Sequence, residues 1–282
     1  MKPVLEVIAA MLIGLAFGYF LGELVMGEAD AAPKDLNVVL LSSNNTVSLR
    51  LPVTDETVEA VQEAMINKKR AGAKELFLVL NSPGGSISAG RTLIETAKGL
   101  GIPVHTISMF SASMSFIISQ YLDTRYVLDS STLMSHRAYV KGMNGSIPGT
   151  LLSQALALHN EIAEISKHIT DRAKMDPQTY DRLIADELWM TGNISLNMHF
   201  ADKVVKVQCD SSLQGDDSPI KIATPFGSLN VVFKKCPLFT DPKLSSDGGD
   251  EKAIRNAFQF FIEQLVPNSI ITRWRAHVGI SK

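Results

Sequence analysis

The sequence predicts an α/β domain with a largely parallel, buried sheet. Apolar, strand-like runs such as residues 76–80 and 103–109 alternate with helix-like segments, a pattern typical of strands that are covered on both faces. The helices are marked by their ends, since Thr54 is placed to cap one that Gly72 closes. The chain has 282 residues, 45% of them hydrophobic, which is enough apolar surface for a sizeable core.

The strands and helices follow one another at short intervals. Further strands are predicted at residues 37–41, 46–51, 124–128, 132–140 and 202–207. Helices are predicted at residues 54–72, from a turn at 81–85 to about residue 98, and at 114–122, 150–174 and 177–188. The long helix 150–174 has a broad apolar stripe, which must be buried on its own sheet or on another subunit.

The chain changes character after residue 208. Residues 34–207 are interpreted as the main domain, and residues 208–240 as an appendage with a hairpin at 220–233. Residues 241–282 are interpreted as a flexible linker, to residue 250, followed by an amphipathic helix at 251–266. This tail packs on the core, mediates assembly or touches a membrane, and the sequence does not choose among the three.

The N-terminal segment has the composition of an export signal. Residues 7–22 are uncharged and apolar, Lys2 precedes them, and residues 29–31 fit a small-x-small cleavage site. Residues 1–31 are therefore predicted to be a cleaved signal peptide or a retained membrane anchor that contacts the bilayer through residues 7–22. A buried soluble helix is the remaining alternative. The positive-inside tendency predicts that the rest of the chain is translocated.

Charge and cysteine content exclude some classes of function. The formal net charge is −2 and there is no long basic run, so no nucleic-acid partner is predicted. Cys209 and Cys236 lack metal-ligand spacing, and neither a metal nor a cofactor is predicted. In an exported protein the two cysteines are expected to form a disulfide, whereas in the cytosol both would stay free thiols.

Ser113 stands at the junction between the strand-like run 103–109 and the helix-like run 114–122. A hydroxyl at the first turn of a helix lies beside unpaired backbone amides, which suits a nucleophile and a developing oxyanion. The alternative for this position is a helix-capping serine. The turn 81–85 also joins a strand to a helix, and its glycines can present backbone amides to a cleft.

The partners that a serine nucleophile needs are also in the sequence. His136 ends an extended run two strands after Ser113, and Asp186 and Glu187 supply a carboxylate that could orient an imidazole. Each of these residues also fits a structural role. The stretch 85–92 has the spacing of a phosphate loop, but Arg91 replaces its lysine, so nucleotide binding is not predicted.

Four segments occur in a characteristic order: NSPGGSISAG, SASMSF, LMSH and ELWMT, at residues 81–90, 111–116, 133–136 and 187–191. Together they resemble the Clp protease proteolytic subunit (ClpP) and its relatives, over roughly residues 36–207. The resemblance implies a ClpP/crotonase-type fold of repeated β-β-α units. It also implies that residues 150–174 form the long handle helix through which subunits pair into a homo-oligomer.

By position, the resemblance implies that Ser113 is the nucleophile and His136 the general base. The triad acid falls on Glu187, where the family has an aspartate, and Asp186 is the alternative acid, one residue off. A glutamate is chemically adequate, because the acid holds the imidazole tautomer and stabilises the imidazolium.

The resemblance also assigns the groups around the nucleophile. The backbone amides of Gly85 and Met114 match the oxyanion hole. The substrate-binding strand region matches Gly84, together with Lys141 and Gly142 of the loop 141–149. Two family glycines that flank the nucleophile are replaced, by Met109 and Ser115, which alters the loop that shapes the oxyanion hole.

Taken with the export signal, the resemblance predicts an exported serine-type endopeptidase that cleaves peptides or unfolded protein segments without an ATPase of its own. The expected location is the periplasm or the extracytoplasmic face of the inner membrane. One alternative is a catalytically inactive ClpP-fold scaffold that binds peptides, suggested by the altered loop around Ser113. The other is a crotonase-type acyl-CoA enzyme, against which the pairing of Ser113 with His136 and the export segment both count.

Overall fold

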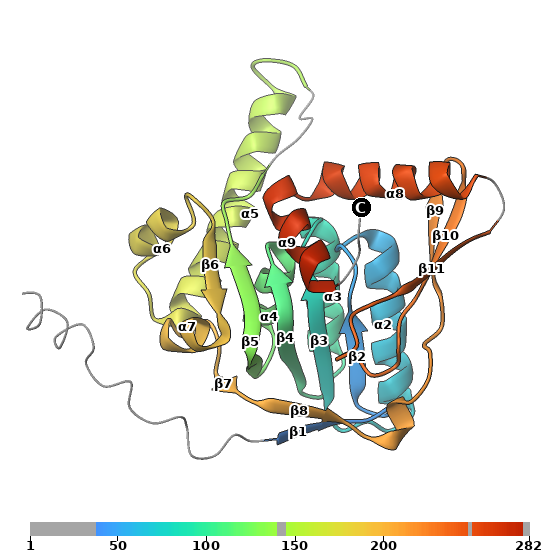
Figure 1. Cartoon of the computed structure of the whole chain (residues 1–282). Coiled ribbons are helices and arrows are strands. Elements are labelled where there is room, and N and C mark those ends of the chain that lie inside the picture. The colour runs from blue at the N-terminus through green and yellow to red at the C-terminus, as the bar shows by residue number, and fades with distance from the viewer. Residues whose placement is uncertain (1–37, 140–144, 248–249, 279–282) are drawn as a thin grey trace, which may run out of the picture. The chain divides into compact units, whose positions relative to one another are not determined.

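The computed structural model describes residues 38–139, 145–247 and 250–278 (Figure 1). Its centre is a sheet with the strand order β2-β3-β4-β5-β6, in which β7 also pairs with β5. The strands are β2 (Thr46–Leu49), β3 (Leu76–Ser82), β4 (Val104–Ala112), β5 (Arg125–Ser135), β6 (Leu188–Thr191) and β7 (Lys203–Val204). Strands β2 to β5 are parallel and β6 is antiparallel to β5, which confirms a largely parallel sheet.

Three helices cover one face of this sheet: α2 (Asp55–Arg70), α3 (Ile87–Gly99) and α4 (Met114–Tyr121). Thr54 caps α2 as expected, and its side chain accepts a hydrogen bond from the Thr57 amide. The apolar positions that predicted this helix, Val58, Val61 and Met65, are buried against Leu76, Leu78 and Leu80 of β3. The side chains of β3 are buried throughout, as its unbroken apolar run predicts.

Three further helices pack beside β5 and β6: α5 (Thr150–Ala173), α6 (Pro177–Leu183) and α7 (Gly192–Asn197). The carboxyl-terminal half of α5 is buried through Ile165 and Ile169, which belong to a core cluster with Phe116 and Phe200. Its amino-terminal half is exposed, with Leu152 and Leu156 57% and 53% accessible to solvent. The apolar stripe of the long helix is thus only partly covered by its own chain.

A two-stranded parallel ribbon of β1 (Val38–Leu41) and β8 (Lys206–Cys209) packs on the second face of the sheet. Val39 and Leu41 of β1 are buried against Phe77 and Val79 of β3. After β8 the chain forms a short 3₁₀ helix, η1 (Ser211–Leu213), and a disulfide joins Cys209 to Cys236.

The rest of that face is covered by the C-terminal segment. Its elements are an antiparallel sheet of β9 (Ile220–Thr224), β10 (Gly227–Val232) and β11 (Lys243–Asp247), and the helices α8 (Glu251–Leu265) and α9 (Asn268–Val278). Phe110, Ala112 and Met134 of the main sheet share a core cluster with Ile262 of α8 and Trp274 of α9. The tail therefore packs on the core, one of the three alternatives that the sequence leaves open.

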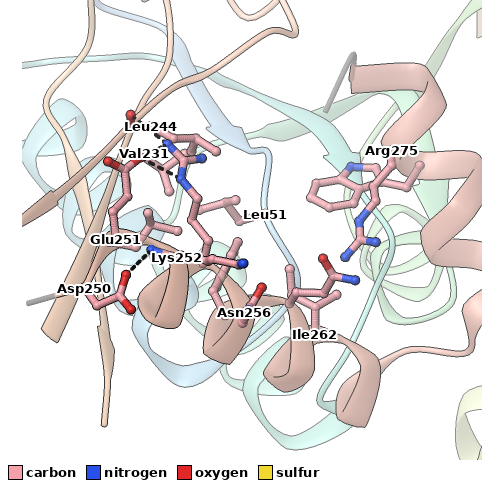
Figure 2. Close-up of a pocket in the computed structure, with 14 residues that line it drawn as sticks. Leu51, Val231, Leu244, Asp250, Glu251, Lys252, Asn256, Ile262 and Arg275 are labelled. Atoms are coloured by element: carbon pink, nitrogen blue, oxygen red, sulfur yellow. Dashed lines mark hydrogen bonds and ion pairs between the residues drawn. The ribbon is translucent and has the colours of Figure 1, made fainter. Parts of the chain in front are cut away.

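Between α8, α9 and the small sheet lies a cavity of about 660 Å³, with Leu51 and Ile262 among its apolar walls (Figure 2). The ring of Trp274 also lines it, and the indole Nε1 donates a hydrogen bond of 3.0 Å to the backbone oxygen of Asn81 in β3. This bond joins α9 directly to the carboxyl end of a central strand.

Several elements differ from those predicted. The two extended runs 124–128 and 132–140 form one strand, β5, because the exposed Asp129 and Ser130 continue its backbone instead of making a turn. The helix that begins at Pro177 ends at Leu183, not near Leu188, since Leu188 begins β6 and pairs with Ser135. The expected linker 241–250 contains β11, whose backbone pairs with β10. The single strand 202–207 is divided into β7 and β8, and α7 and α9 were not predicted.

The predicted export segment, residues 1–31, lies outside the described residues, as do Lys141 and Gly142 of the expected substrate-binding loop. Within the described part of the chain, each helix is too short or too polar to cross a bilayer.

Candidate active site

Ser113 lies where β4 ends and α4 begins. Its backbone angles, φ 53° and ψ −122°, are ones that a residue with a Cβ seldom adopts, at a cost of about 1–3 kcal/mol. The turn is held by a hydrogen bond of 2.9 Å from the Ser113 amide to the backbone oxygen of Met134 in the neighbouring strand. The Ser113 hydroxyl makes no capping hydrogen bond to α4, so the structure does not support the helix-capping alternative.

The side chain of His136 faces this hydroxyl. Strands β4 and β5 are adjacent and parallel, so the residues that follow their carboxyl ends meet at the same edge of the sheet. The two atoms His136 Nε2 and Ser113 Oγ are 2.8 Å apart, a hydrogen bond in which the imidazole can take the hydroxyl proton.

Burial lowers the pKa of His136, and the nearby charge of Glu187 and a hydrogen bond with the backbone of Arg137 oppose that decrease. The imidazole is thus neutral at pH 7, as a general base requires.

Glu187 is the carboxylate beside His136. It directly precedes β6, whose pairing of Leu188 with Ser135 brings the two residues together. Its Oε2 accepts a hydrogen bond of 3.0 Å from Trp189 Nε1, and its Oε1 accepts one of 2.7 Å from Ser269 Oγ. Among charged side chains, it is Glu187 that acts on the pKa of His136.

Asp186, the alternative acid, acts on another group. Its charge contributes to the raised pKa of Arg137, after the larger effect of Asp181, which is paired with Arg137 at 2.7 Å. Of the two adjacent carboxylates, Glu187 therefore fits the position of a triad acid better.

The glycine turn lies directly against Ser113. Gly84 has φ +88°, and a Cβ on it would stand 2.6 Å from both Ser113 Cβ and the backbone oxygen of Ala112, so only glycine fits. Gly85 has φ +148° and pairs with Val53, and the backbone of Val53 bonds to Gly84 and Ser86 at 2.8 Å each. The conformation of the turn is therefore fixed from both sides.

The two residues whose amides were predicted to form the oxyanion hole lie on either side of this contact: Met114 directly follows Ser113, and Gly85 directly follows Gly84, which contacts Ser113. Met114 is the first residue of α4, so its amide has no acceptor within the helix. The replaced glycines are accommodated: Ser115 is buried with its hydroxyl 3.1 Å from that of Ser111, and Met109 falls where the register of β4 and β5 shifts. The predicted residues Ser113, His136, Gly84 and Met114 thus come together, and Gly85 adjoins Gly84. Glu187 lies beside His136 and acts on it through its charge, without a hydrogen bond between the two side chains.

The C-terminal segment also lines the site, which no sequence pattern indicates. A cavity of about 440 Å³ beside His136 and Glu187 is also lined by Val266, Pro267 and Asn268. Ser269 follows these residues, 82 positions from Glu187 along the chain, and no local pattern marks such a contact. Among the described residues, no cluster of three His, Cys, Asp or Glu side chains could hold a metal ion.

Comparisons with known proteins agree with this geometry. The family model for Clp protease matches residues 31–208, more than half of the chain. The ATP-dependent Clp protease proteolytic subunit of Leuconostoc citreum (strain KM20) is 27% identical over 139 residues, which cover 47% of this chain and 68% of that protein.

The subunit of the same name from Streptococcus mutans serotype c is 24% identical over 170 residues, 59% of this chain and 87% of that protein. That from Streptococcus gordonii is 26% identical over 173 residues, with a coverage of 58% and 86%. The matched region contains β2 to β7 and the candidate site residues of the main domain, from Gly84 to Glu187. It does not contain the C-terminal segment. The chain therefore belongs to the Clp protease family and is a serine-type peptidase.

Proposed function

We propose that the protein is an endopeptidase that cleaves peptides or unfolded protein segments through a Ser113–His136–Glu187 triad. The observation that carries the proposal is the distance of 2.8 Å between His136 Nε2 and Ser113 Oγ, at a strained turn that leaves this hydroxyl free of any capping role. The lowered pKa of His136 supports the role of a neutral base.

In the proposed reaction, Ser113 Oγ attacks the carbonyl carbon of the scissile peptide bond while its proton passes to His136 Nε2. The oxyanion of the tetrahedral intermediate accepts hydrogen bonds from the amides of Gly85 and Met114. The C–N bond then breaks, the imidazolium gives its proton to the leaving amine, and an acyl ester remains on Ser113. Water, deprotonated by His136, hydrolyses the ester and returns the hydroxyl. Glu187 stabilises the imidazolium throughout.

The proposed enzyme works without an ATPase of its own. Its phosphate-loop-like stretch 85–92 has Arg91 at the position of the lysine, and that guanidinium is paired with Glu161 at 2.9 Å instead of facing a phosphate. Subunits pair through α5, a role supported by the exposed Leu152 and Leu156.

The proposed location is outside the cytoplasm, in the periplasm or at the extracytoplasmic face of the inner membrane. Support comes from the apolar residues 7–22 and from the disulfide between Cys209 and Cys236, a bond that persists in oxidising compartments.

Labelling of the active-site serine tests the proposed chemistry. A fluorophosphonate, which phosphonylates an activated serine, is expected to label the wild-type protein, while Ser113→Ala abolishes labelling and His136→Ala slows it by at least about a hundredfold. The attached mass is read by intact-protein mass spectrometry, and its position by peptide mapping. If the wild type stays unlabelled, or if Ser113→Ala labels equally well, the proposed mechanism is wrong.

A further inference from the structure

Helix α9 contacts the proposed triad acid from outside the family domain. The family match ends at residue 208, whereas Ser269 lies in α9 and donates its hydroxyl hydrogen bond to Glu187 Oε1 at 2.7 Å. The contact therefore belongs to a part of the chain that the family domain does not include.

The same helix also contacts Trp189, the second hydrogen-bond partner of Glu187. Arg273, four residues after Ser269 on α9, places its guanidinium carbon 4.3 Å from the centre of the Trp189 ring. Trp189 in turn donates to Glu187 Oε2 at 3.0 Å. One carboxylate oxygen is thus bonded to α9 directly, and the other is bonded to a side chain that α9 covers.

The position of α9 is itself well fixed. Trp274, 1% exposed, donates its indole hydrogen bond to Asn81 in β3, and Ile270 and Ile271 are buried in the same core cluster. Ser269 is exposed, so its side chain contributes little to that cluster. A hydroxyl on such a rigid helix can hold a carboxylate in one orientation without being part of the core.

A glutamate needs this support more than an aspartate does. Its side chain has one more torsion, and fixing a free carboxylate costs more conformational entropy when the chain that carries it is longer. Glu187 also has φ 66°, so its backbone departs from the usual extended path at this strand entrance. The hydrogen bonds from Ser269 and Trp189 therefore offset the greater freedom of the longer Glu187 side chain.

We propose that Ser269 is a positioning residue, by which α9 holds the Glu187 carboxylate in place beside His136, where its charge acts on the imidazole. This inference rests on the proposed triad, to which it adds a component from the C-terminal segment. The charged side chains that share the cavity with His136 are Arg137 and Glu187 on the side of the main domain, and Glu263 on α8. Of these, Glu187 is the one that Ser269 bonds.

The test compares rates of fluorophosphonate labelling across pH for the full chain. Ser269→Ala is expected to lower the second-order rate constant about tenfold, because a hydrogen bond to a charged group is lost. Its pH midpoint should also move lower, since a loosely held carboxylate raises the pKa of His136 less. Ser269→Thr keeps a hydroxyl and should restore both the rate and the midpoint.

Thr272→Ala is the matched control, because Thr272 is an exposed hydroxyl residue on the same helix, and it should label like the wild type. Thermal unfolding followed by circular dichroism checks that all variants are folded. Equal rates and midpoints for Ser269→Ala and the wild type, or faster labelling of Ser269→Ala, overturn the inference and leave the triad intact. A wild type that does not label overturns the triad, and this inference with it.

Discussion

At the residue scale, the catalytic proposal depends on how burial and charge compete at His136. Burial lowers the pKa of the imidazole, and the carboxylate of Glu187 limits the decrease. A base works in its neutral form, so a lowered pKa extends activity toward acidic pH. The strained φ of Ser113 matters in a different way, because it aims the hydroxyl at His136 and away from the amides of α4.

This competition predicts a pH dependence. Labelling of the wild type by a fluorophosphonate should rise with pH along a single acidic limb whose midpoint lies below the ordinary histidine pKa of about 6.5. In Glu187→Gln the midpoint should fall further, because the charge that raises the pKa of His136 is gone, and the plateau rate should drop by at least about tenfold as the imidazolium loses its counter-charge. A midpoint that rises in Glu187→Gln would contradict the assigned electrostatics.

The positions that form the candidate site were largely predictable, and the reason is local. Ser113, Gly84 and Gly85 lie at strand-to-helix turns, where a short motif determines the backbone conformation. The contact of Ser269 with Glu187 was not predictable, because it depends on a helix that packs against a strand far away in sequence. Long-range contacts of this kind leave no periodic pattern in the chain.

At the scale of elements, the apolar pattern predicted the strand β3, which is buried on both faces, and the helix α2, which is buried on one face. The apolar pattern did not predict strands that are held by backbone pairing and have few buried side chains. Asp129 and Ser130 are polar and exposed within β5, and β11 has only Leu244 packed against the core cluster. Such strands form because their backbone pairs with a neighbouring strand. This pairing cannot be predicted from the side chains of the strand itself.

Helix α5 gives a prediction at this scale. Its exposed Leu152 and Leu156 are expected to be buried between subunits, so the double variant Leu152→Glu/Leu156→Glu should shift the protein to a smaller assembly, measured by light scattering after size-exclusion chromatography. Gln154→Glu, on the same helix at an exposed polar position, adds a charge without removing an apolar contact and serves as the control. An unchanged mass in the double variant would place the subunit interface elsewhere.

At the scale of the whole molecule, the proposed location and the disulfide make one prediction. Protein isolated without reductant should have an intact mass lower by two hydrogens than after reduction, because Cys209 and Cys236 are joined. A mature chain that begins at Ala32 would identify residues 1–31 as a cleaved signal peptide, and a full-length mass would exclude cleavage. Two free thiols in the isolated protein would contradict the proposed export.

The core cluster that joins Phe110, Ala112 and Met134 to α8 and α9 limits which parts of this chain can be exchanged independently, in evolution or in protein engineering. The residues of the proposed triad lie in one stretch of the chain, but the apolar face of the sheet that carries them is covered by another. A recombination that exchanged only the residues matched by the family model would transfer the candidate site together with a sheet face that is exposed to water. Selection is therefore expected to keep the two parts linked, and sequence changes in Trp274 or Ile262 to be tolerated only with matching changes in the main sheet.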